Sequence, residues 1–316
     1  MQEVEPNPMM ALALLRAMRP HQWVKNVFVL APLFFARAAG ETWSTDYGDV
    51  HSALLALVAF VLGSSAIYLL NDLWDVESDR AHPQKRLRPI ASGALPVGAA
   101  RAAVAGCAAL SLAAGHGAGG EPVSVAWVVL AYMALNFLYS ARLKRIVLVD
   151  VFCIAAGFLL RVIAGGVAAG AQLSQWLMLC TLFLALFLAL CKRRAETDLL
   201  GGERADHRAT LGEGAYNVRF LDQMVTALAA CTILCYAMYT VSEETVSKFG
   251  TEQLIWTVPF VVFGLARYML LVTNERAGGS PARTLLGGDA MFVGNCLAWL
   301  VCVAVLLLGK GSPAGG

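Results

Sequence analysis

The stretch ALLALVAFVLGSSAIYLLNDLWDVESDR covers residues 53–80 and joins two very different compositions. Its first 18 residues carry no charge, which is typical of a helix that crosses the hydrocarbon core of a bilayer. Its last ten residues carry four acids and one arginine. Charged residues that directly follow a spanning helix predict a functional site at one mouth of a helical bundle.

The composition of the whole chain agrees with a membrane protein. Of its 316 residues 58% are hydrophobic and only 15% are charged, whereas soluble domains carry about a quarter charged residues. We predict an all-α, polytopic membrane protein with one domain over residues 1–316, including a short N-terminal segment 1–20 and a C-terminal tail 310–316. Apolar runs predict nine transmembrane helices: Val24–Ala38, Val50–Leu70, Val97–Gly115, Val123–Ser140, Val147–Ala168, Leu173–Leu190, Asp222–Val241, Leu254–Thr273 and Ala290–Leu308.

Positive charge is unevenly divided between the loops. When the loops are assigned alternately to two sides, one side receives most of the Lys and Arg residues and the other only Arg37, Lys248 and Lys310. The positive-inside rule then predicts a cytoplasmic N-terminus and an external C-terminus. Almost all acids also lie on the basic side. We therefore expect a cytoplasm-facing active-site cavity in an integral protein of the bacterial inner (plasma) membrane.

Three of the acids have a spacing that carries chemical information. On a helix, Asp72, Asp75 and Asp79 would share one face. Carboxylate oxygens suit Mg²⁺, which proteins typically hold by one or two carboxylates plus substrate phosphates; the residues do not distinguish it from Mn²⁺. Cations that suit phosphate oxygens follow in one short loop: Lys85, Arg86 and Arg88. Together they predict a polyphosphate site, and the alternative is a solvated helix cap.

Two motifs resemble a known family. NDLWDVESD (Asn71–Asp79) matches the NDxxDxxxD pattern that follows helix 2 in the UbiA-type intramembrane prenyltransferase superfamily. YSARLKR (Tyr139–Arg145) is similar to its Tyr-x-x-x-Lys element, with one extra residue before Lys144. The resemblance covers nearly the whole chain and implies a nine-helix transferase. It also implies that Asp72, Asp75 and Asp79 bind Mg²⁺ on a diphosphate, with Asn71 orienting that helix end or reaching a substrate oxygen.

The chain departs from the aromatic prenyltransferases of this superfamily after the sixth expected helix. Those enzymes carry a second acidic motif there, whereas CKRRAETD (Cys191–Asp198) begins with three consecutive cations. Several segments together resemble the branch that transfers 5-phosphoribose from phosphoribosyl pyrophosphate to a polyprenyl (decaprenyl-type) phosphate: MRPHQWVKN, HPQKRLRPIASG, YSARLKRIVLVD, GFLLRVIAGG and KRRAE. The resemblance implies a Mg²⁺-dependent transfer that releases pyrophosphate, in the synthesis of arabinan-type cell-wall precursors.

This reaction would need a site for a diphosphate, a ribose 5-phosphate and a lipid phosphate. One acidic cluster and many cations suit these three phosphate-bearing groups better than two acidic clusters would. We expect the substrates to meet Lys25, Lys85, Arg86, Arg88, Tyr139, Lys144, Asp150, Arg161, Lys192, Arg193, Arg194 and Glu196. For Lys25, a flanking charge of the positive-inside kind is an equal alternative.

Two of these residues leave alternatives open. Asp150 begins the fifth expected helix and would bind a ribose hydroxyl or pair with Lys144. Arg161 lies eleven residues further on, well inside an apolar helix, where an unpaired cation costs about 2.5–3.5 kcal/mol on insertion scales. We expect Arg161 to face the bundle interior and to meet either a substrate phosphate or a carboxylate from another helix.

Other functions remain to be weighed against this one. A prenyltransferase that acts on an aromatic acceptor would favour a DxxxD pair in the loop that instead carries KRRAE. A transporter would string ionisable residues through the bilayer, whereas the charges here cluster at one mouth. We expect no nucleic-acid partner, and a homo-oligomer is compatible with the sequence. The length and saturation of the lipid acceptor are not determined by these residues.

Overall fold

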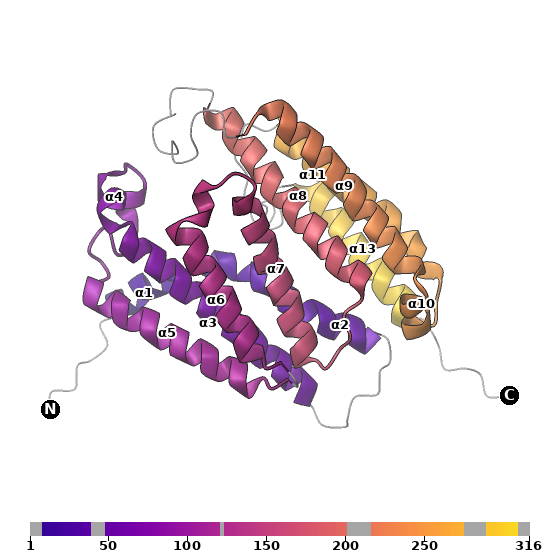
Figure 1. The fold of residues 1–316 in the computed structure, drawn as a ribbon, viewed down its shortest axis with the longest axis horizontal. Helices are drawn as coiled ribbons and strands as arrows, with labels where there is room; N and C mark the ends of the chain where they lie inside the picture. The colour runs from indigo at the N-terminus through magenta and orange to yellow at the C-terminus, as the bar shows by residue number, and fades with distance from the viewer. Residues whose placement is uncertain (1–7, 39–47, 121–122, 201–215, 275–288, 309–316) are drawn as a thin grey trace.

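The computed structural model describes residues 8–38, 48–120, 123–200, 216–274 and 289–308. Residues 1–7 of the expected N-terminal segment and the expected tail 310–316 lie outside this part of the chain. Within it the fold is all-helical and contains no strand, which confirms the predicted class (Figure 1). The elements are α1 (Pro8–Ala17), η1 (Pro20–Leu30), α2 (Ala31–Ala38), α3 (Gly48–Trp74), α4 (Val76–Ala81), η2 (Lys85–Leu87), α5 (Val97–Gly117), α6 (Val125–Ala141), η3 (Leu143–Arg145), α7 (Val149–Ala168), α8 (Gln175–Leu200), α9 (Val218–Val241), α10 (Glu243–Phe249), η5 (Gln253–Thr257), α11 (Val258–Asn274) and α13 (Ala290–Leu308).

Among the described residues, seven helical segments are long and apolar enough to cross a membrane. They are Val50–Trp74, Val97–Gly117, Val149–Ala168, Gln175–Thr197, Val218–Val241, Gln253–Thr273 and Ala290–Leu307. The expected span Val123–Ser140 corresponds to α6, an apolar helix of only 17 residues. The chain is therefore an integral membrane protein, while the count of nine spans stays a prediction.

The first expected span, Val24–Ala38, is not one continuous α-helix. Its N-terminal part belongs to the 3₁₀ helix η1, and α2 begins only at Ala31. Pro32 occupies the first turn of α2, where its missing N–H is tolerated because no helical carbonyl would accept it. A 3₁₀ helix rises about 2.0 Å per residue, so η1 is longer than an α-helix with the same number of residues. Side chains that are three positions apart in η1 lie directly above one another.

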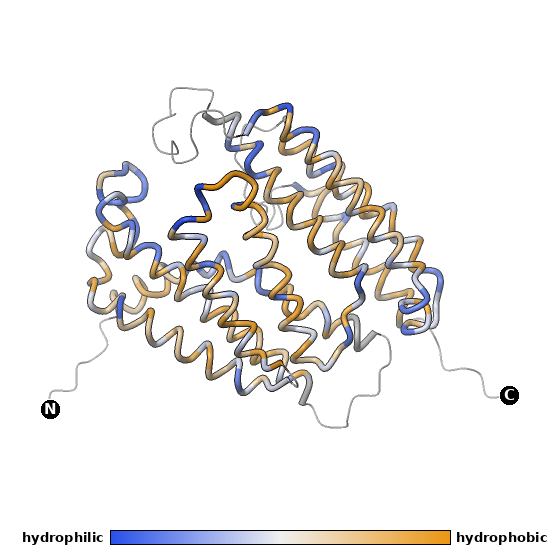
Figure 2. Tube along the Cα trace, viewed as in Figure 1, coloured by the Kyte–Doolittle hydropathy of each residue, from blue (hydrophilic) through white to orange (hydrophobic). Residues whose placement is uncertain are grey.

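The helices pack as two groups that meet where α7 lies beside α8 (Figure 1). In the first group, α3, α6 and α7 enclose a core around Phe60, Val129 and Ala164. In the second, α7, α8, α9 and α11 enclose a core around Phe187 and Leu221. Figure 2 shows hydrophobic residues along the helices and hydrophilic residues gathered at their ends. The packing therefore brings the charged residues to the ends of the bundle.

A close approach of α7 to η1 depends on one glycine. A Cβ built on Gly165 would overlap the carbonyl oxygen of Val29 and lie 3.1 Å from Cδ of Pro32. Small residues at such crossings let helix backbones approach in membrane proteins. The obstructing atom belongs to the backbone, so it cannot move aside by changing a rotamer.

We predict that Gly165→Ala lowers the free energy of unfolding by about 2–3 kcal/mol, because overpacking forces the two backbones apart. The measurement is an unfolding titration in mixed detergent micelles. Gly106→Ala in α5 is the matched control, since nothing lies within 4 Å of its added Cβ, and alanine is the better helix former by about 0.5–1 kcal/mol. Equal stability of the Gly165 and Gly106 variants would contradict the close approach.

Candidate active site

The acidic motif straddles a break between two helices. α3 ends at Trp74 and α4 begins at Val76, and Asp75 between them has φ −91° and ψ 6°. The three aspartates therefore do not lie on one uninterrupted helix. The chain still turns tightly, because the N–H of Asp75 donates to the carbonyl of Asn71 at 3.0 Å. The break separates Asp72 at the end of α3 from Asp79 on α4.

Asp72 and Asp79 form an acid–arginine cluster with Arg88 and Arg19. Asp72 is only 2% exposed and Asp79 only 1%. Arg88 Nη1 donates to Oδ1 of Asp72 at 3.2 Å and to Oδ2 of Asp79 at 2.7 Å. Arg19 Nη2 donates to the same oxygen of Asp72 at 2.6 Å. Buried carboxylates need such partners, because an unpaired charge in a protein interior costs several kcal/mol.

Arg19 is the member of this cluster that sequence reasoning missed as a site residue. It precedes η1 with φ 56° and ψ 64°, a left-handed conformation that few non-glycine residues adopt. This backbone turn directs its guanidinium to Asp72, 53 positions away in the sequence. The segment MRPHQWVKN pointed to the region, but spacing alone does not pair Arg19 with an acid on another helix.

The cluster has the donor chemistry that a divalent cation needs. Asp72 and Asp79 present hard carboxylate oxygens on both sides of the Arg88 cation, and Mg²⁺ is typically held by one or two carboxylates together with substrate phosphates. Asp75 is partly buried and forms no ion pair with a described residue. No group of three His, Cys, Asp or Glu side chains within the described ranges is arranged to hold a metal alone. Two carboxylates thus fit Mg²⁺, and Asp75 as a third ligand stays a prediction.

A second charged cluster joins the start of α7 to the end of α8. Asp150 is fully buried and accepts hydrogen bonds from Arg193 Nε at 2.8 Å and from the Tyr216 hydroxyl at 2.7 Å. Arg193 Nη1 also donates to Glu196 at 2.7 Å. Asp150 therefore pairs with Arg193, and the alternative pairing with Lys144 is wrong. The reason is that α8 packs against α7 and carries Arg193 to Asp150.

Tyr216 was not identified from the sequence, although it holds this cluster in place. Its hydroxyl accepts the N–H of Leu148 at 2.8 Å while donating to Asp150. Leu148 has φ 67°, so the hydrogen bond secures a backbone conformation that is unfavourable for leucine. Burial raises the pKa of the Tyr216 phenol, and the hydrogen bond to Asp150 raises it further. Tyr139, an expected site residue, lies near Arg193 in the same cluster.

Arg161 faces the bundle interior, as predicted, and is 5% exposed. Its Nε donates to Asn26 Oδ1 at 2.8 Å, and its Nη2 donates to the Tyr132 hydroxyl at 2.9 Å. The guanidinium also lies 4.7 Å from the ring centroid of Tyr132, within the range of cation–π attraction. No carboxylate of the described residues forms an ion pair with Arg161, so of the two alternatives the Glu or Asp partner does not hold for this part of the chain.

A cation group lies between the two charged clusters. Lys25 is within electrostatic reach of Arg19, Arg161 and Lys192, and it forms no ion pair with any residue that the structure describes. We call Arg19, Lys25, Arg161 and Lys192 the cation group. Arg19 and Lys192 are each offset by an ion pair, with Asp72 at 2.6 Å and with Glu196 at 3.9 Å, whereas Lys25 and Arg161 have no carboxylate partner among the described residues. Neighbouring cations attract anions, so the cation group is a candidate site for a phosphate.

Some predicted site residues lie apart from these clusters. Lys85 and Arg86 are exposed on η2, and neither forms an ion pair with a described residue. Lys144 is partly buried on η3, also without an ion pair there. Arg194 pairs with Asp222 of α9 at 2.7 Å. Of the predicted site residues, Asp72, Asp79 and Arg88 thus lie in the acid–arginine cluster, Asp150, Arg193, Glu196 and Tyr139 in the second charged cluster, and Lys25, Arg161 and Lys192 in the cation group, while these four lie apart.

The fold and the site together define a class of protein. It is an integral membrane protein whose apolar helices carry buried carboxylates and a group of cations suited to phosphate-bearing molecules. The sequence profile of the UbiA prenyltransferase family matches residues 27–295. The chain belongs to this family and is a transferase.

Relatives of similar length support the assignment. The decaprenyl-phosphate phosphoribosyltransferase of Corynebacterium glutamicum is 37% identical over 306 residues, covering 95% of this chain and 88% of the relative. The enzyme of that name from Mycobacterium tuberculosis is 35% identical over 300 residues and covers 95% of each chain. A UbiA homolog from Archaeoglobus fulgidus bound to GPP and Mg²⁺ has the same fold, with a TM-score of 0.66 at 19% identity over 94% of this chain and 99% of that one.

Proposed function

We propose that the protein transfers 5-phosphoribose from phosphoribosyl pyrophosphate to a polyprenyl (decaprenyl-type) phosphate and releases pyrophosphate. The observation that carries this proposal is one buried acid–arginine cluster beside a cation group. Relatives that share 35–37% of their residues and bear the name decaprenyl-phosphate phosphoribosyltransferase support it. A site that is built from two carboxylates and many cations suits two phosphate-bearing substrates better than it suits a neutral aromatic acceptor.

The proposed reaction requires little covalent chemistry from the protein. The bond between ribose C1 and the pyrophosphate oxygen breaks, and its electron pair leaves with pyrophosphate. A lipid phosphate oxygen forms the new bond to C1, which passes through the oxocarbenium character common to glycosyl centres. No general base is required because the lipid phosphate is already ionised at neutral pH. Rate enhancement then comes from positioning and from stabilising the charge of the leaving group.

The acid–arginine cluster is the proposed site of the donor pyrophosphate. Asp72 and Asp79 would hold Mg²⁺, or Mn²⁺ in its place, with Asp75 as a third ligand. A bound metal withdraws charge from a leaving pyrophosphate. Arg88 bridges the two buried carboxylates and would turn to the phosphate oxygens when a metal takes over its role. Asn71 would orient the end of α3 or reach a substrate oxygen.

The cation group is the proposed site of the lipid phosphate. Lys25 and Arg161 lie near each other without a carboxylate partner among the described residues. Lys192 extends this positive surface at the end of α8, while Asp150 and Glu196 hold Arg193 beside it. The remaining expected contacts would approach the ribose 5-phosphate or close the site over both substrates: Lys85, Arg86, Tyr139, Lys144 and Arg194.

We further propose how the molecule sits in the cell. The distribution of Lys and Arg favours nine spans with the N-terminus and the site in the cytoplasm of a bacterium. A cytoplasmic site would suit a water-soluble, charged donor. The product would then serve as a lipid-linked pentose precursor for arabinan-type cell-wall polymers.

The deciding experiment supplies purified protein with Mg²⁺, decaprenyl phosphate and phosphoribosyl pyrophosphate labelled in the ribose. We expect label to move into the organic phase and to require both the metal and the lipid phosphate. A parallel reaction supplies labelled geranyl diphosphate and an aromatic acceptor such as 4-hydroxybenzoate. Transfer in the second reaction alone would replace the proposal with prenyl transfer, and transfer in neither would contradict the proposed donor and acceptor.

A further inference from the structure

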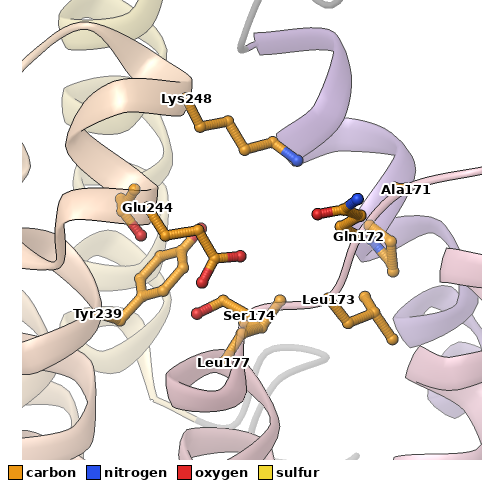
Figure 3. Close-up of a pocket in the computed structure, with 10 residues that line it drawn as sticks. Ala171, Gln172, Leu173, Ser174, Leu177, Tyr239, Glu244 and Lys248 are labelled. Carbon is orange, nitrogen blue, oxygen red and sulfur yellow. The ribbon is translucent and has the colours of Figure 1, made fainter.

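A polar pocket lies at the opposite end of the helices from the candidate active site. It is formed by the connection between α7 and α8, by α10 and by the start of α2 (Figure 3). Nineteen residues of chain, almost all of them in α8, separate Ser174 in the pocket from Arg193, or roughly 28 Å at 1.5 Å per residue. The pocket is therefore separate from both charged clusters and plays no part in the proposed transfer.

The pocket contains a buried hydroxyl without a hydrogen-bond partner. Ser174 is 6% exposed, and its Oγ forms no hydrogen bond within the described residues. Figure 3 shows this hydroxyl directed into the space between Tyr239 and Leu173. Leaving a buried hydroxyl unpaired costs about 1–3 kcal/mol. A ligand with a polar group at this position would remove that cost.

Charges of opposite sign line the same space. Glu244 and Lys248 lie one turn apart on α10 and both face the pocket (Figure 3). α10 is held at its two ends: the Ser242 hydroxyl accepts the N–H of Thr245 at 3.3 Å, and Gly250 ends the helix in a left-handed conformation with φ 58°. These caps hold the two charges on one side of the opening.

The shape of the pocket restricts what can enter. Its enclosed part has a volume of about 20 Å³, within a wider open space of about 370 Å³. A volume of this size admits one water-sized group, since a water molecule needs about 10–15 Å³ on this measure. The wall also contains apolar side chains, those of Pro32, Leu173 and Leu177, next to the polar side chains of Gln172, Tyr239 and Thr245. A ligand with a water-sized polar group on a partly apolar molecule would match both the small volume and the apolar side chains of the wall.

We propose that this pocket binds the headgroup of a zwitterionic aminophospholipid of the phosphatidylethanolamine class. The primary ammonium would enter the enclosed part and donate hydrogen bonds to the Glu244 carboxylate and to Ser174 Oγ. The lipid phosphate would meet Lys248 at the opening, and the glycerol and first methylenes would lie along Leu173 and Leu177. The position at the ends of the spanning helices is the depth at which lipid headgroups lie.

Charge and size distinguish this lipid class from others. An anionic headgroup without an amine would bring a second negative charge near Glu244 and offer no cation to that carboxylate. A trimethylated ammonium has no N–H to donate and is larger than the enclosed volume. Phosphatidylethanolamine should therefore bind more tightly than phosphatidylcholine or phosphatidylglycerol, by about tenfold if one charge-assisted hydrogen bond makes the difference.

Native mass spectrometry of the full-length protein in detergent tests the proposal. The probes are palmitoyl-oleoyl phosphatidylethanolamine, phosphatidylcholine and phosphatidylglycerol at equal concentration. We expect preferential retention of phosphatidylethanolamine by the wild type. Glu244→Gln and Ser174→Ala should each reduce that preference, by about tenfold for the charge change. Glu243→Gln is the matched control, because Glu243 is exposed on the same helix but does not line the pocket.

The outcomes separate this proposal from the transfer reaction. Equal retention of the three lipids by the wild type would overturn it, and so would preference for phosphatidylglycerol. This comparison needs no variant, so it decides the matter even if a substitution prevents folding. Unchanged preference in folded Glu244→Gln would also overturn it. Asp72→Asn should leave lipid preference intact, because Asp72 lies at the other end of the bundle.

Discussion

Asp72→Asn is expected to lower the turnover of phosphoribosyl transfer by about 1,000-fold, in line with the loss of a group that stabilises transition-state charge. The substitution keeps the shape of the side chain and removes only its negative charge. Asp72 is 2% exposed and accepts hydrogen bonds from both Arg19 and Arg88. Solvent water therefore cannot compensate for the loss of its negative charge. The proposed Mg²⁺ site would lose one of two buried carboxylates, and the Mg²⁺ concentration for half-maximal rate should rise.

The measurement is turnover in the labelled-donor assay across a Mg²⁺ titration. Asp79→Asn should behave similarly, because Arg88 bridges the two acids. Glu77→Gln is the control: Glu77 is exposed on α4 and should change the rate less than about twofold, as surface substitutions usually do. A folded Asp72→Asn protein with unchanged turnover and unchanged Mg²⁺ requirement would refute the proposed role of the cluster.

Arg161→Met is expected to lower kcat/KM for the lipid phosphate by about 100-fold, which corresponds to about 2.7 kcal/mol of lost transition-state binding. Arg161 is a buried cation whose partners among the described residues are neutral oxygens and aromatic rings. Its charge is thus free to stabilise an anion in a low-dielectric surrounding. Arg161→Lys should not restore the rate, because an ammonium cannot reach Asn26 and Tyr132 together as the guanidinium fork does.

Stability measurements separate this role from a structural one. Replacing a buried charge by an apolar side chain removes the cost of keeping that charge out of water, which offsets the loss of the hydrogen bonds to Asn26, Tyr132 and the carbonyl of Gly157. We expect the ligand-free thermal midpoint of Arg161→Met to stay within a few degrees of the wild type. Polyprenyl phosphate should raise the midpoint of the wild type and not of the variant. Arg101→Met, an exposed arginine on α5, is the control, and full activity of Arg161→Met would contradict the assignment.

Local sequence predicted the helical class and the position of the acids well. Uncharged runs require helices in a bilayer, because every backbone polar group must be satisfied within its own segment. The interior position of Arg161 was predicted for a similar reason, since a cation in an apolar helix must turn away from lipid. The break between Asp72 and Asp79 could not be predicted, because spacing reports a periodicity and not the backbone angles that end α3 at Trp74.

The partners of the charged residues depended on packing between distant segments. Asp150 and Arg193 are 43 positions apart, and Asn26 and Arg161 are 135 apart. Such pairs form because α8 lies beside α7 and η1 crosses α7 at Gly165, and neither contact leaves a local pattern. Tyr216 likewise joins Leu148 to Asp150 across 66 or more positions. A tyrosine before a helix is too common to single out from the sequence alone.

The sequence by itself determined that this chain is a membrane-embedded helical bundle with an acidic motif directly after an apolar helix, because hydropathy and charge act residue by residue. Only the tertiary structure decided that Arg88 joins Asp72 to Asp79, that Arg161 meets Asn26 and Tyr132, and that Ser174 lies unpaired in a second pocket. The physical reason is that a hydrogen bond requires atoms within about 3 Å. Distances of that size are set by how helices cross.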